Sequence, residues 1–141
     1  MQEQHKITFR TVIKVPAGKV WQALTDPALV EQYFFGSKQD TDWKVGSPIF
    51  FRGEWEGKTY EDKGIVLSFN PGRSLSYSYL SSWSGLPDVP GNYLRVGYTV
   101  APVEGGTELT IEQTNYDAER AQHSRENWER VIEGMRKLVE E

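Results

Sequence analysis

Few side chains in this chain are spaced so that they could perform metal or acid–base chemistry. The only two histidines, His5 and His123, lie near the N-terminus and at the start of the last predicted helix. A metal site needs clustered ligands, and a Ser–His–Asp triad needs a histidine beside its nucleophile. Neither follows from this spacing. We therefore expect two surface histidines, no metal site and no cofactor.

The strongest candidates for a catalytic pair are Arg52 and Glu54, in the segment IFFRGEWE. Alternate residues of a strand point to opposite faces, so this segment has two registers. In one register Phe51 and Trp55 point inward. In the other, Phe50 points inward together with Arg52 and Glu54, and this pair could anchor a polar group or catalyse a reaction. Both faces carry a large ring, so both registers stay open; we favour the first.

Other carboxylates flank a predicted hairpin turn at residues 56–58. Acid–base catalysis requires carboxyl groups in a cleft that shifts their pKa values. Because residues beside a turn are usually solvated, we expect Glu56, Glu61 and Asp62 to face water.

Aromatic residues make up 13% of the chain, and their positions suggest a binding site. Tyr77, Tyr79 and Tyr98 fall on the apolar faces of predicted strands, and Gln113 shares such a face. These polar groups exceed what a dry core needs, and a cavity with a few convergent polar groups explains them. The alternative is that the hydroxyls reach solvent at the ends of the sheet. The candidate ligand-binding residues are Phe34, Phe35, Trp55, Tyr77, Tyr79, Trp83, Tyr98, Gln113, Trp128 and Met135.

Strands and two short helices must position these residues. Residues 6–15 alternate between apolar and polar and predict a strand. Val20–Phe34 predicts a helix divided in two at Pro27, because proline is favoured at a first helical position and disfavours helix before it. From Ser37 to Asn115, alternating segments separated by Gly, Pro and Asn predict about six further strands.

A long amphipathic helix is predicted at the C-terminal end. Asp117 is placed to cap it. Its apolar stripe contains Trp128 and Met135, and we expect Arg130 on the outer face. This helix is the only long element available to cover the apolar face of the sheet.

Composition excludes several classes of function. The 141 residues suit one domain, which we place at 1–141. A net charge of −4 with scattered Lys and Arg argues against nucleic-acid binding. The absence of cysteine excludes disulfides and fits a reducing cytoplasm. No apolar run approaches the ~20 residues that cross a bilayer, so we expect no membrane insertion.

Several segments together resemble the START-like (SRPBCC) helix-grip superfamily. They are VWQALTDPALVEQYF, DWKVGSPIFF, GIVLSFNPGRSLSYSY, GGTELTIEQT and NWERVIEGMRKL. More narrowly, the chain is similar, over about residues 6–139, to bacterial proteins related to the C-terminal domain of the activator of Hsp90 ATPase. The resemblance implies an α+β fold in which a curved antiparallel sheet of about six to seven strands wraps around a long C-terminal helix. It also implies a cavity between sheet and helix.

We expect a cytoplasmic protein that binds an apolar or aromatic small molecule in this cavity. Two alternatives remain. One is a cofactor-independent, cyclase-like enzyme that uses tyrosines with Arg52 and Glu54. The other is a co-chaperone module that binds an Hsp90-type partner, although the activator's separate N-terminal domain is not in this sequence.

Overall fold

The computed structural model describes residues 5–34, 36–81 and 86–140, with only the backbone of Trp55 and Pro90. Seven strands form one antiparallel sheet in the order β1-β7-β6-β5-β4-β3-β2. The strands are β1 (Ile7–Ile13), β2 (Lys38–Asp40), β3 (Pro48–Trp55), β4 (Lys58–Asn70), β5 (Ser74–Tyr79), β6 (Leu94–Val103) and β7 (Gly106–Gln113). The helices are α1 (Ala17–Thr25), α2 (Pro27–Tyr33), the short 3-10 helix η1 (Pro90–Asn92) and α3 (Ala118–Glu140).

The break between α1 and α2 lies where the sequence predicts it. Pro27 occupies the start of α2, where its missing N–H costs no helical hydrogen bond. Asp26 precedes it and accepts a hydrogen bond from the Ala28 N–H at 3.0 Å. The side chain of Asp26 therefore satisfies one of the free N–H groups at the helix start.

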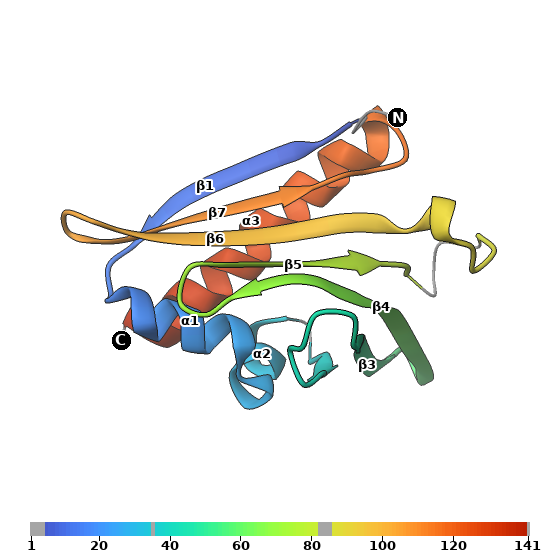
Figure 1. Ribbon diagram of the computed structural model, residues 1–141, viewed down its shortest axis with the longest axis horizontal. Helices are drawn as coiled ribbons and strands as arrows, with labels where there is room; N and C mark the ends of the chain where they lie inside the picture. The colour runs from blue at the N-terminus through green and yellow to red at the C-terminus, as the bar shows by residue number, and fades with distance from the viewer. Residues whose placement is uncertain (1–4, 35, 82–85, 141) are drawn as a thin grey trace.

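Helix α3 lies across one face of the sheet, while α1 and α2 lie at one end of it (Figure 1). Asp117 caps α3 by accepting the Arg120 N–H at 2.8 Å. Farther along α3, Arg136 donates to the Val12 carbonyl at 2.6 Å and to the Thr11 hydroxyl at 2.5 Å. These contacts attach the helix to β1.

The core fills the space between α3 and the inner face of the sheet. Inward positions of β1, β5 and β7, such as Ile13, Leu75 and Leu109, are buried, and Val131 and Ile132 of α3 pack against this cluster. The predicted α+β helix-grip fold is confirmed. No helix in the described part of the chain is long and apolar enough to cross a membrane.

The hairpin between β3 and β4 forms where it was expected, but β4 is longer than the sequence suggests. Glu56 and Gly57 both have positive φ angles, 53° and 80°, as in a two-residue hairpin turn. The polar residues 58–63, which precede the obvious apolar run at Gly64, already pair with β3. Because β4 begins at Lys58, Asp62 is a strand residue rather than a turn residue.

Candidate functional site

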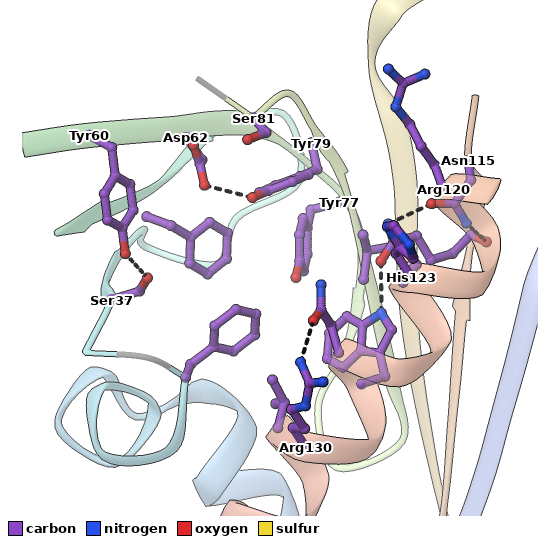
Figure 2. A pocket seen from close by; sticks show the side chains of 18 of the residues that line it. Ser37, Tyr60, Asp62, Tyr77, Tyr79, Ser81, Asn115, Arg120, His123 and Arg130 are labelled. Atoms are coloured by element: carbon purple, nitrogen blue, oxygen red, sulfur yellow. Dashed lines mark hydrogen bonds between the residues drawn. The ribbon is translucent and has the colours of Figure 1, made fainter. Parts of the chain in front are cut away.

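A cavity of about 810 Å³ lies between the sheet and the first half of α3. This is within the range of about 300–1,000 Å³ that is usual for small-molecule sites. The residues that follow α2 close one side of it (Figure 2). Its apolar lining consists of Phe34, Phe51, Tyr77, Val96, Trp128 and Val131.

Aromatic rings from β3, β5, α3 and the residue that follows α2 pack against one another around this cavity. Phe34 stacks on Phe51 of β3 with a centroid distance of 5.9 Å and an interplanar angle of 24°. Phe34 also meets Trp128 of α3 edge to face at 5.8 Å, and Phe51 contacts Tyr77 of β5 at 5.6 Å. The rings therefore offer both faces and edges to an apolar guest.

A chain of hydrogen bonds joins α3 to the end of β7 at the cavity wall. The Trp128 indole N–H donates to Gln113 Oε1 at 2.7 Å. The Gln113 amide nitrogen in turn donates to Asn115 Oδ1 at 3.3 Å. Both polar partners line the cavity. Gln113 thus provides a partner for the buried indole, and this holds the ring in one orientation.

A carboxylate lies on the strand side of the cavity. Asp62 of β4 is buried and accepts a hydrogen bond of 2.6 Å from the Tyr79 hydroxyl (Figure 2). Burial raises the pKa of Tyr79 well above its usual value, and the Asp62 carboxylate raises it further. Tyr79 therefore stays protonated and serves as a donor to Asp62. Nearby, the hydroxyls of Ser37 and Tyr60 form a hydrogen bond of 2.5 Å.

The α3 side of the cavity is polar and carries positive charge. His123, Asn127 and Arg130 follow one another at spacings of four and three, so they share one face of the helix. The buried residue Ser124 lines the cavity beside them. Arg130 reaches Asn127 Oδ1 at 3.4 Å (Figure 2).

Half of the candidate ligand-binding residues line the cavity: Phe34, Tyr77, Tyr79, Gln113 and Trp128. Phe35 and Trp83 lie outside the described residues, as does the side chain of Trp55.

Tyr98 and Met135 do not line the cavity but belong to the core. Tyr98 lies behind Tyr77, to whose hydroxyl it is hydrogen-bonded at 2.9 Å, and burial raises the pKa of both phenols. Val96, two residues earlier in β6, takes the position at the cavity wall. Met135 lies about two helical turns beyond Trp128, roughly 10 Å along α3. There α1 and α2 close the helix against the sheet.

The favoured register of β3 is confirmed. Phe51 is buried in the core and lines the cavity, whereas Glu54 is exposed. Arg52 forms ion pairs of 2.6 Å with Asp40 and with Glu61 on the outer side of the sheet. Because Arg52 and Glu54 point away from the cavity, they cannot act together on a molecule inside it.

One expectation about a charged residue was wrong, and another was incomplete. Asp62 was expected in water, but the extension of β4 makes it an inward position two residues before Gly64. Arg130 was expected on the outer face of α3; it is exposed, but it also borders the cavity. Strand alternation counted back from Gly64 could have found Asp62. Helical periodicity places Arg130 outside the apolar stripe, and it gives no sign that the side chain borders the cavity.

The site offers hydrogen-bond donors, acceptors and aromatic surface rather than metal ligands. Among the described residues no group of three or more His, Asp or Glu side chains could hold a metal ion. The arrangement is suited to holding an organic molecule by its apolar body and orienting it through polar groups at two sides.

Comparison with solved structures shows the same architecture in bacterial proteins. ChR145 from Cytophaga hutchinsonii is 40% identical, with a TM-score of 0.85 and 99% and 97% of the two chains covered. MLL2253 from Mesorhizobium loti is 26% identical, with a TM-score of 0.77 and 96% of each chain covered. CalU16 from Micromonospora echinospora, at 21% identity, shares the fold with a TM-score of 0.77, covering 95% of this chain and 75% of its own.

No curated protein matches the chain in sequence. The model of one protein family does match, over residues 14–140, and its description is activator of Hsp90 ATPase homologue 1-like protein. This match spans both α1 and the cavity-lining part of α3. The chain therefore belongs to the activator of Hsp90 ATPase homologue 1-like family, within the START-like helix-grip proteins.

Proposed function

We propose that this protein binds an apolar or aromatic small molecule in the cavity between the sheet and α3. The observation that carries the proposal is a cavity of about 810 Å³ whose lining combines six Phe, Tyr and Trp rings with polar side chains. Removing apolar surface from water supplies the affinity, at about 25 cal/mol per Å². The polar groups at the two sides then select the orientation of the guest.

The test uses Nile red, a neutral dye whose fluorescence rises in apolar surroundings. We expect saturable binding by the folded protein. Val131→Phe should weaken it at least about tenfold, equivalent to ~1.4 kcal/mol, because the new ring occupies the cavity. Val131 is buried on α3 and lines the cavity, so the larger ring can extend into open space rather than into packed core.

Val12→Phe is the matched control. Val12 is 42% exposed and lies on the outer face of β1, away from the cavity. This variant should bind Nile red like the unmodified protein. Equal affinities for all three proteins, or no binding by the unmodified protein, would contradict the proposed function. Thermal unfolding of each variant shows whether the fold is retained.

A further inference from the structure

Arg130 differs from the other arginines of α3 in lacking a strong partner. Arg120 forms an ion pair with Asp117 at 2.8 Å, and Arg136 pairs with Glu140 at 3.5 Å. Arg125 donates to the Thr8 carbonyl at 3.1 Å. Within the described residues, Arg130 has only the long contact of 3.4 Å to Asn127, and no carboxylate pairs with it. This is notable in a chain with 20 acidic and 16 basic residues.

The neighbours of Arg130 along the cavity wall are also donors. His123 and Asn127 lie on the same helix face, one above the other, and both line the cavity. Acidic groups that line the cavity lie elsewhere: Asp62 is on β4, where Tyr79 donates to it, and Glu56 is in the turn before β4. Figure 2 shows Asp62 on the strand side and Arg130 on the helix side. Lys58 of β4 also lines the cavity, so the strand side carries charges of both signs, whereas the charged lining residues of α3 are all basic.

Ser124 is a buried polar residue on the same helix wall, but its hydroxyl oxygen is not open to the cavity. Its side chain is 8% exposed and lines the cavity on α3, one turn before Trp128. Its hydroxyl oxygen has no hydrogen-bond partner in the described part of the chain. That oxygen is covered by protein atoms, so a guest in the cavity would meet other atoms of Ser124 and not its hydroxyl.

We propose that the ligand is an amphipathic anion, an apolar or aromatic body with one acidic group, and that α3 binds the acidic group through Arg130 and its neighbours. This inference rests on the proposed function and specifies its ligand. The body lies against Phe34, Phe51 and Trp128. The acidic group accepts hydrogen bonds from the Arg130 guanidinium and the Asn127 amide.

Charge-assisted hydrogen bonds make this arrangement selective for an anion over a neutral guest of the same shape. A guanidinium presents two parallel N–H donors that match the two oxygens of a carboxylate. Such bonds are roughly twice as strong as those between neutral groups. An alcohol would keep the apolar contacts but could use only one weaker bond to Arg130.

The experiment measures displacement of Nile red by two competitors with the same alkyl chain, dodecanoate and dodecanol, near neutral pH. Only the head group differs between them. We expect Arg130→Gln to weaken dodecanoate about tenfold, the loss of one charge-assisted interaction, and to leave dodecanol within about twofold. Arg130→Lys should recover part of the loss, because it restores the charge without the planar pair of donors.

Arg125→Gln is the matched control. It removes the same charge from the same helix, but Arg125 contacts the Thr8 carbonyl and does not line the cavity. Both competitors should bind this variant as they bind the unmodified protein. A loss of dodecanoate affinity as large as in Arg130→Gln would show that overall charge, and not a site at Arg130, attracts the anion.

The outcomes separate this inference from the proposed function. If Nile red and dodecanol bind but Arg130→Gln leaves dodecanoate unchanged, or weakens both competitors equally, the anion site is overturned and the cavity keeps its function. If neither the dye nor the competitors bind the unmodified protein, both proposals fail.

Discussion

Trp128 connects the cavity with the core through both its ring and its nitrogen. The ring meets Phe34 on one side and Tyr98 on the other, each edge to face at 5.8 Å. The indole N–H donates to Gln113. With only 6% of its surface exposed, this side chain is the largest on α3 that belongs to the core and the cavity wall at once.

We expect Trp128→Ala to lower the free energy of unfolding by about 3–5 kcal/mol, the usual cost of removing a large buried ring. Trp128→Phe should cost less, because it keeps an aromatic ring and loses mainly the hydrogen bond to Gln113. Urea denaturation measures both values. Glu129→Ala, at the adjacent exposed position, should stay within about 0.5 kcal/mol of the unmodified protein. If Trp128→Ala and Glu129→Ala had equal effects, α3 would not pack as described.

At the scale of elements, β4 lies close against the backbone of β5 at Gly64. A Cβ atom on Gly64 would overlap the Ser78 carbonyl oxygen and lie 3.2 Å from the Tyr79 nitrogen. Two residues before this point is Asp62, and Tyr79 is its hydrogen-bond partner from β5. The missing side chain at Gly64 therefore lets the two strands bring this pair together.

Gly64→Ala should push β4 and β5 apart and destabilise the protein by about 1–3 kcal/mol, the usual range for overpacking. Gly97→Ala in β6 is the matched control. A Cβ there would meet nothing nearer than 3.8 Å, so stability should be unchanged or slightly higher. Chemical denaturation midpoints compare the two. Similar midpoints for both variants would mean that β4 does not approach β5 as closely as the structure shows.

At the scale of the whole molecule, several tyrosine phenols are buried in one connected region. Burial raises the pKa values of Tyr33, Tyr77, Tyr79 and Tyr98 above the usual value. In the unfolded chain these phenols ionise near pH 10. Folding therefore requires them to stay protonated at a pH where the unfolded chain loses its protons.

The contribution of these phenols to the free energy of unfolding should consequently be constant below about pH 9 and fall as the pH rises above about 10. The sign follows from the raised pKa of these phenols in the folded protein. Their stabilising contribution is full below their pKa in the unfolded chain, and it is lost as the pH rises above that value. Urea denaturation at a series of alkaline pH values measures this slope. Tyr77→Phe, which removes one such phenol, should make the fall shallower. A free energy of unfolding that stays level well above pH 10 would contradict the burial of these groups.

The sequence by itself determined the order of the elements and most of their inward faces. Alternation placed Tyr77 and Gln113 inward, Pro27 marked the break between the short helices, and Asp117 marked the start of the last helix. These signals are local, because strand alternation, proline geometry and helix capping act over a few residues.

Only the tertiary structure decided which inward residues meet the cavity. Tyr98 and Met135 are as buried as the pattern indicated, yet they belong to the core, because α1 and α2 close α3 against one end of the sheet. Asp62 is inside because β4 continues through polar residues to pair with β3. Arg130 is exposed, yet it borders the cavity beside Trp128 and Val131 of α3. The cavity lies between elements that are distant in sequence. Local periodicity therefore does not predict its shape or its lining.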